Sequence, residues 1–148
     1  MKISTRVEYG MLALADIALY AEKGNSVSAP EIAERQNISQ KYLEQILTQL
    51  KQAGLIRAQK GLRGGYALAR AADKISIAEI LNALDNSILE AVECSGDENE
   101  RSLRKAVNAC LWERMNGLLI EFTKSKTLSE FIQECRDRLS GEWDLYII

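Results

Sequence analysis

The side chains best suited to chemistry lie in one stretch, residues 28–68. A helix expected to begin at Ser39 has leucine and isoleucine at helical spacing on one face, which leaves lysine, glutamine and threonine on the other. The turn Lys60–Gly65 follows, with two cations and several glycines, a composition that favours positive φ and close backbone approach. Amide, ammonium and guanidinium groups donate hydrogen bonds to base edges and phosphates, so this stretch is a candidate nucleic-acid surface.

Local signals predict how these side chains are positioned. Ser28 and Glu31 form the pattern of a capping box, so a short helix begins there and fades before the second one starts. Gly54 ends the second helix, since glycine permits the left-handed conformation. Side chains alternate with a period of two over residues 55–59, and Tyr66–Leu68 can form a second strand that pairs with them, so a hairpin is predicted. The stretch is therefore predicted to be a helix-turn-helix followed by a two-stranded wing.

This predicted shape is typical of proteins that read duplex DNA, because the second helix fits the major groove and the wing reaches backbone or minor groove. The formal net charge is −2, yet residues 1–75 hold 11 Lys/Arg against 7 Asp/Glu, while residues 76–148 hold 8 against 14. Salt screens charges over ~8–10 Å, so a basic N-terminal half can bind DNA on an acidic protein. A generic helical domain with a surface hairpin is the alternative.

Composition narrows the class of protein further. The 148 residues are 47% apolar and 27% charged, as in soluble globular proteins. No apolar run long enough for a membrane helix and no signal-peptide pattern is present, so we expect a cytoplasmic protein. The chain has no histidine, which removes histidine-based acid–base and nucleophilic catalysis, and it has no nucleotide-binding glycine fingerprint. We therefore do not expect an enzyme.

The first helix is expected over about Val7–Glu22. Thr5, Arg6 and Tyr9 lie at its N-terminal end, where free N–H groups and the helix dipole favour an anion. A DNA phosphate is the anion we expect there. Packing of Tyr9 against neighbouring side chains is the alternative.

Beyond the wing, the pattern divides the chain into a DNA-binding domain over 1–86, an acidic loop over 87–102, and a C-terminal part over 103–148. The last part holds a long amphipathic helix, a final helix that begins after Thr127, and an apolar tail. The long helix has nothing of its own to pack on, so we expect a homodimer on a palindromic operator. Folding of this helix onto the first helix is the alternative. The expected dimerisation residues are Val107, Leu111, Met115, Leu118 and Phe122. The predicted fold class is thus mostly α with a small β-wing: a winged helix-turn-helix plus a long dimerisation helix.

Four motifs resemble the Rrf-type bacterial transcription regulators, a family that includes IscR, NsrR and CymR. They are the wing Lys60–Tyr66, the helix start Ile38–Gln45, the opening Met1–Thr5 and the pair Leu111–Trp112. The resemblance covers nearly the whole chain, and it implies a homodimeric winged helix with a long crossing helix.

Carried over position by position, the resemblance implies a set of DNA contacts. Base-reading residues fall at Ser39, Lys41, Tyr42, Glu44 and Gln45, and a minor-groove cation falls at Lys60. Chemically, Gln45 can pair with an adenine edge and Glu44 can accept from a cytosine amine. Lysine replaces the arginine often found at the wing, which weakens narrow-groove reading. The full DNA-binding set also includes Ser28, Gln40, Arg63 and Gly64.

Cluster-binding members of this family carry three cysteines in the acidic loop and at the start of the long helix. Cys94, Cys110 and Cys135 are spaced too widely for a metal-ligand pattern, and Ala106 stands where the alignment places the third cysteine. We therefore expect no cofactor, and in particular no iron–sulfur cluster, and we expect Cys110 to be a small core residue. Cys94 is a candidate redox-sensitive thiol, so an iron–sulfur or redox-sensing regulator remains the alternative.

Without those cysteines, the chain looks more like the cysteine-metabolism repressors, a branch that also ends in an aromatic-apolar tail finishing in isoleucine. That resemblance implies a repressor of sulfur and cysteine genes that works with cysteine synthase. Tyr146, Ile147 and Ile148 are the candidate contacts, because a carboxylate anchors through charge-assisted hydrogen bonds and isoleucine fills an apolar pocket. A tail packed on the dimer is one alternative. A protein-interaction adaptor that has lost DNA binding is another.

Overall fold

The computed structural model describes residues 2–21, 24–61, 64–91 and 101–141. It is mostly helical with one two-stranded sheet, as predicted. The elements in chain order are α1 Thr5–Tyr20, α2 Ala29–Gln36, α3 Gln40–Gln52, β1 Ile56–Gln59, β2 Gly65–Leu68, α4 Ile77–Leu84, α5 Leu103–Val107, α6 Glu113–Ser125 and α7 Leu128–Leu139. A short 3₁₀ turn precedes α4, and a π-helical turn joins α5 to α6. Most of the predicted acidic loop lies outside the described residues.

The helices begin where side-chain caps are available. α1 starts two residues earlier than expected, because the hydroxyl of Ser4 accepts a hydrogen bond from the Val7 N–H. A reciprocal capping box forms in full at Ser76: its hydroxyl accepts from the Glu79 N–H, and the Glu79 carboxylate accepts from the Ser76 N–H. Ser28 caps α2 through its hydroxyl.

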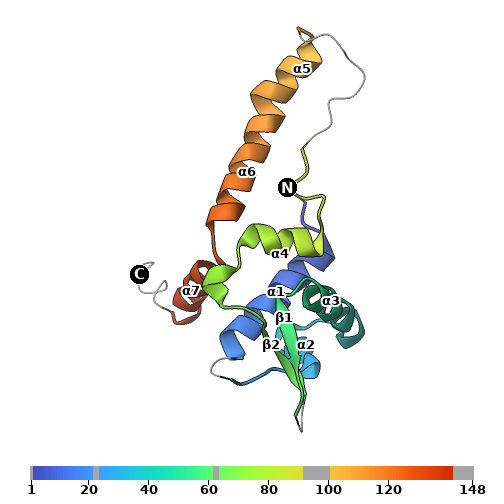
Figure 1. Ribbon diagram of the computed structural model, residues 1–148, viewed down its shortest axis with the longest axis vertical. Coiled ribbons are helices and arrows are strands. Elements are labelled where there is room, and N and C mark those ends of the chain that lie inside the picture. Colours follow the sequence, from blue (N-terminus) through green and yellow to red (C-terminus); the bar gives the residue numbers. More distant parts are fainter. Residues whose placement is uncertain (1, 22–23, 62–63, 92–100, 142–148) are drawn as a thin grey trace.

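One core holds the body of the molecule together. α1 crosses its centre, and α2, α3, α4 and the wing pack around it (Figure 1). The last helix joins the same core, since Leu128 and Ile132 are buried in it. Backbone hydrogen bonds hold the start of α7 against the start of α4: an isolated antiparallel β-bridge joins Ser76 to Thr127, and the Leu128 N–H donates to the Ile75 carbonyl at 2.8 Å. The division of the chain at residues 86 and 102 stays a prediction.

A buried ion pair fixes α2 against α1. Asp16 is 1% exposed, and its carboxylate accepts two hydrogen bonds from Arg35, at 2.9 and 2.8 Å, and one from Gln36 at 2.8 Å. The guanidinium of Arg35 also lies over the Tyr20 ring at 4.5 Å. The hydrogen bonds that Arg35 donates to the Asp16 carboxylate raise the pKa of Arg35, which keeps the guanidinium charged. The first helix of the helix-turn-helix therefore has one defined orientation on α1.

The long helix stands apart from this body. It runs without a break from Leu103 to Ser125 and rises from the body on the side opposite the wing tip (Figure 1). Apolar residues recur every four positions from Leu103 to Met115. At 100° per residue, each step of four places the next apolar side chain about 40° further around the helix axis. The wide turn at Asn108–Trp112 takes up part of this drift. No helix in the described ranges is both long and apolar enough to cross a membrane.

Candidate nucleic-acid interface

The second helix of the helix-turn-helix divides into a buried face and an exposed face. Asn37 takes the left-handed conformation, with φ 53°, and turns the chain between α2 and α3. The buried face of α3 consists of Leu43, Ile46, Leu47 and Leu50. The exposed face carries four of the predicted contacts: Gln40, Lys41, Glu44 and Gln45. The helical spacing thus predicted both faces, and the core fixes which one remains free.

Hydrogen bonds already order part of this exposed face. The hydroxyl of Ser39 accepts from the Tyr42 N–H at 3.5 Å, so Ser39 caps the helix and keeps its own O–H free to donate. The side-chain amide of Gln40 donates to the Glu44 carboxylate at 3.3 Å. Glu44 is therefore held along the helix, while Lys41 and Gln45 project from the same surface.

The start of α1 lies beside the start of α3. The rings of Tyr9 and Tyr42 meet edge to face, with centroids 5.9 Å apart. A hollow of about 370 Å³ opens there, lined by Ser4, Thr5, Arg6, Tyr42 and Asp85. The predicted phosphate contacts on α1 and the predicted base contacts on α3 thus form one continuous surface. Tyr9 packs against Tyr42, and its contact with a DNA phosphate stays a prediction.

Ser4 and Asp85 were not among the predicted site residues. Ser4 could have been found from its position, because a serine directly before an apolar helix is a standard N-cap. Asp85 has no such signal, since only the packing of α4 on α1 brings it there. Hydrogen bonds from the Ser87 hydroxyl and backbone N–H lower the pKa of Asp85, and Arg6 lowers it a little further. Arg6 therefore has an anionic neighbour in this hollow.

The wing is a tight antiparallel hairpin whose base is clamped to the body. Ile56 pairs with Leu68 and Gln59 with Gly65, and Tyr66 also exchanges two backbone hydrogen bonds with Val27, at 3.0 and 2.7 Å. Gly65 lies so close to this third segment that a Cβ would meet the Ser26 hydroxyl at 2.6 Å. Close backbone approach, rather than positive φ, therefore explains this glycine.

The tip of the wing presents the remaining predicted contacts. Lys60 is exposed directly after β1, and Gly64 is exposed with φ 57°. Arg63 lies outside the described residues. Ser28 is half-buried and serves as the cap of α2, with its hydroxyl 3.3 Å from the Glu31 N–H. Ser28 thus caps α2 and lies away from both α3 and the wing tip.

An exposed polar helix next to a cationic hairpin tip, both fixed on one small core, defines a winged helix-turn-helix DNA-binding protein. The sequence pattern of the Rrf2 family, described as iron-dependent transcriptional regulators, matches residues 3–134. The chain therefore belongs to the Rrf2 family of transcriptional regulators, which confirms the resemblance found in its motifs.

Individual relatives agree with this assignment. The HTH-type transcriptional regulator IscR of Cereibacter sphaeroides is 38% identical over 137 residues, which cover 90% of this chain and 88% of the relative. The structure of CymR, the global cysteine regulator of B. subtilis, matches with a TM-score of 0.76 and 31% identity, over 90% of this chain and 98% of that one. IscR of T. potens matches with a TM-score of 0.73 and 32% identity, over 91% and 88% of the two chains. Because the family and these relatives are transcriptional regulators, the chain is a DNA-binding regulator and not an enzyme.

The iron in the family's description raises the question of whether this chain's own residues fit a cluster. Cys110 is exposed on the π-helical turn, while Cys135 is half-buried on α7. Across the described ranges, no three histidine, cysteine or acidic side chains converge on a common point. Cys94 lies outside those ranges. The described residues therefore do not fit a three-cysteine cluster site. The expectation that Cys110 is a core residue is wrong, because its helix stands away from the core.

Proposed function

We propose that this regulator acts as a homodimer on palindromic operators and represses genes of sulfur and cysteine metabolism. The structural similarity to CymR, the global cysteine regulator of B. subtilis, supports the choice of pathway. Genome-wide recovery of DNA bound to the protein tests it, because the genes beside the bound sites name the pathway. Sites beside sulfur-assimilation and cysteine genes are expected. Sites confined to other pathways would contradict the assignment.

The exposed apolar stripe of the long helix carries the proposal of a dimer. Its members are between 41% and 80% exposed in the protomer, far more than large apolar side chains in a finished core: Leu103, Val107, Leu111, Met115, Leu118 and Phe122. A second copy would cover this stripe by a two-fold axis. The same axis would present two α3 helices to half-sites ~34–36 Å apart, or a multiple of that distance.

The proposed base contacts lie on α3, and the proposed groove contact is Lys60. Replacing Gln45 with alanine should cost ~1–3 kcal/mol at one base pair and relax specificity there, because a bidentate contact to an adenine edge is lost. Lys60→Ala should weaken binding to all sequences about equally and lower the salt slope by about one. Lys124→Ala is the matched control, since Lys124 is an exposed lysine on α6, away from the DNA-facing elements. Fluorescence anisotropy at several salt concentrations measures both effects.

Phosphate contacts are proposed for Thr5 and Arg6, beside the hollow at the start of α1. Tyr42 would present the edge of its ring from the facing helix. Arg63 and Gly64 complete the set at the wing tip.

A partner enzyme is proposed for the tail. Tyr146, Ile147 and Ile148 lie outside the described residues, and the resemblance to cysteine-metabolism repressors supports binding of cysteine synthase there. Titration of the full chain and of a variant lacking residues 146–148 with cysteine synthase tests this idea. Loss of binding in the shortened variant is expected. Equal binding by the two proteins would rule the tail out.

An iron–sulfur or redox-sensing regulator is the second candidate function. The family's description as iron-dependent and the similarity to IscR proteins favour it. Anaerobic purification followed by visible absorption and by iron and sulfide analysis decides between the two. A coloured protein with stoichiometric iron would favour the second candidate, and Cys94→Ser would then show whether that thiol takes part.

A further inference from the structure

A carboxylate lies among the proposed phosphate contacts. The hollow of about 370 Å³ at the start of α1 is lined by Thr5 and Arg6 from that helix, and by Asp85 from the end of α4. Among the described residues that line it, Arg6 carries the one positive charge and Asp85 the one negative charge. A phosphate is attracted by the first and repelled by the second. The hollow thus holds a group that opposes the ligand proposed for it.

The core fixes the position of this carboxylate. Leu84, directly before Asp85, is 1% exposed, and Gly10 on α1 lies so close to it that a Cβ would meet the Leu84 side chain at 2.3 Å. The side-chain amide of Gln49 on α3 donates to the Leu84 carbonyl at 3.4 Å. The end of α4 is therefore held against both helices that supply the proposed DNA contacts, and Asp85 cannot leave the hollow without a loss of core packing.

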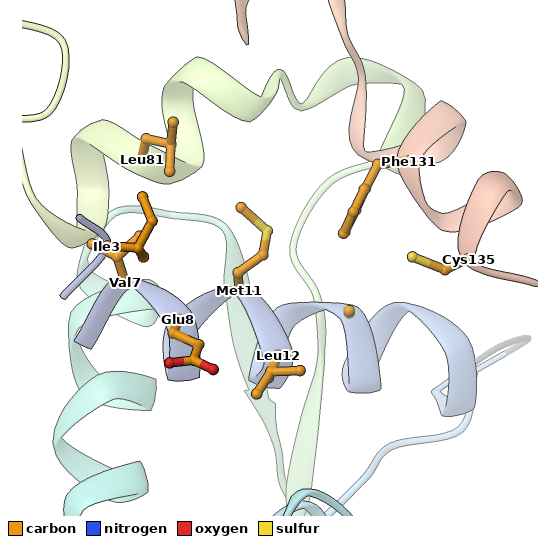
Figure 2. Close-up of a pocket in the computed structure, with 9 residues that line it drawn as sticks. Ile3, Val7, Glu8, Met11, Leu12, Leu81, Phe131 and Cys135 are labelled. Carbon is orange, nitrogen blue, oxygen red and sulfur yellow. The ribbon is translucent and has the colours of Figure 1, made fainter. Parts of the chain in front are cut away.

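The start of α1 is held by the same helix. Ile3 and Val7 line an open apolar groove together with Leu81 of α4, and these three side chains lie at one end of it (Figure 2). Arg6 directly precedes Val7, which is 2% exposed. The backbone of Arg6 is therefore fixed relative to α4, and so relative to Asp85.

Hydrogen bonds also orient the carboxylate. The Ser87 hydroxyl and backbone N–H donate to Asp85 Oδ1 at 2.6 and 3.0 Å. These bonds lower the pKa of Asp85, and the charge of Arg6 lowers it further, so the group is ionised near neutral pH. The negative charge is thus a permanent feature of this surface.

We propose that Asp85 offsets the charge of Arg6 and thereby weakens the binding of the DNA backbone at the start of α1. This inference rests on the proposed phosphate contact of Arg6 and names the group that sets its strength. Because a phosphate contact carries no sequence information, Asp85 should lower the affinity for operator and for unrelated DNA by the same factor. The protein would then leave every DNA site more readily than its cationic contacts alone would allow.

Removal of the charge tests the proposal. Asp85→Asn deletes the charge and keeps an oxygen that can accept the bonds from Ser87. At about 0.05 M salt, the variant should bind a recovered operator duplex and an unrelated duplex of equal length roughly three- to tenfold more tightly, because a unit charge close to a phosphate is removed. The gain should shrink as added salt screens the charge, so the salt slope should steepen by up to about one. Fluorescence anisotropy measures both quantities.

Two further variants control for net charge and for the carboxylate itself. Asp137→Asn changes the net charge by the same amount on α7, where Asp137 accepts a hydrogen bond from Gln133 at 3.0 Å. Its affinity for both duplexes should stay close to that of the unaltered protein. Asp85→Glu keeps the charge and should bind more weakly than Asp85→Asn. Circular dichroism and urea unfolding check that all the variants are folded and equally stable.

The outcomes separate this inference from the proposed function. Unchanged binding by Asp85→Asn would overturn the inference, and so would weaker binding, since Asp85 would then position Arg6 for the phosphate. A lower affinity and a shallower salt slope in Arg6→Ala mean that the phosphate contact stands, whatever Asp85→Asn does. If Arg6→Ala changes neither quantity, the phosphate contact fails and the inference fails with it.

Discussion

Removing the two halves of the ion pair between α1 and α2 should have unequal effects. Asp16 is 1% exposed, whereas the side chain of Arg35 is 33% exposed and lies on the Tyr20 ring. In Asp16→Ala, the freed guanidinium can turn toward water. In Arg35→Ala, a buried carboxylate keeps only the hydrogen bond from Gln36. The second variant should therefore be the less stable one, although it removes the more exposed residue.

The magnitudes follow from what each variant leaves behind. Breaking a buried pair by removing one partner costs ~3–5 kcal/mol when the remaining charge stays buried. We expect Arg35→Ala to fall in that range. Asp16→Ala should cost roughly 2–3 kcal/mol, because charge-assisted hydrogen bonds are lost while no buried charge is stranded. The double variant should be less destabilised than the sum of the two single variants, since the single losses share one interaction.

Urea unfolding at one fixed protein concentration measures these differences, because dimerisation would make the midpoint concentration-dependent. The exposed pair Arg70–Glu79 supplies the scale, since breaking it should cost about 0.2–1 kcal/mol. The reasoning is refuted if Asp16→Ala is destabilised as much as Arg35→Ala or more. It is equally refuted if neither variant differs from Arg70→Ala, which breaks the exposed pair and leaves the capping box at Ser76 in place.

Two further predictions concern the wing and the stability of the fold at low pH. Gly65→Ala should displace the wing, because a Cβ would lie 2.6 Å from the Ser26 hydroxyl; we expect a loss of roughly 1–3 kcal/mol and weaker DNA binding, measured by urea unfolding and anisotropy. Gly61→Ala, where a Cβ would meet nothing within 4 Å, should change neither measurement. The hydrogen bond from Arg70 lowers the pKa of Glu79 below its ordinary 4.5, so the pair stabilises the fold above that pH and this contribution is lost as pH falls through the lowered pKa. Arg70→Ala should thus cost less than ~1 kcal/mol at neutral pH, and the cost should shrink as pH falls through the lowered pKa of Glu79; a cost independent of pH would contradict the assignment.

Most local features of the DNA-facing part could be predicted from the chain alone. Ser39 and Gly54 are residues whose own hydroxyl or backbone chemistry starts or ends a helix, and the structure confirms both positions. The buried face of α3 followed from the spacing of its apolar residues. These signals are readable because they act over three or four residues.

The features that were missed depend on segments far apart in the chain. No local signal marks the partner of Asp16, because only packing brings Arg35, nineteen residues further along the chain, beside it. The wide turn at Asn108–Trp112 has no local marker, and the exposure of Cys110 follows from a helix that leaves the body. Asp85 reached the hollow only through the packing of α4.

By itself, the sequence determined the elements, the polar face of the second helix, the cationic hairpin and the membership of a regulator family, because each is written in short-range spacing or in contiguous motifs. Only the tertiary structure decided that the starts of α1 and α3 share one surface, that Gly65 is needed for contact with Ser26 and Val27, and that the apolar stripe of the long helix stays exposed in the protomer. The physical reason is that burial is a property of the whole packed chain: the same leucine is core or interface according to which distant segment reaches it.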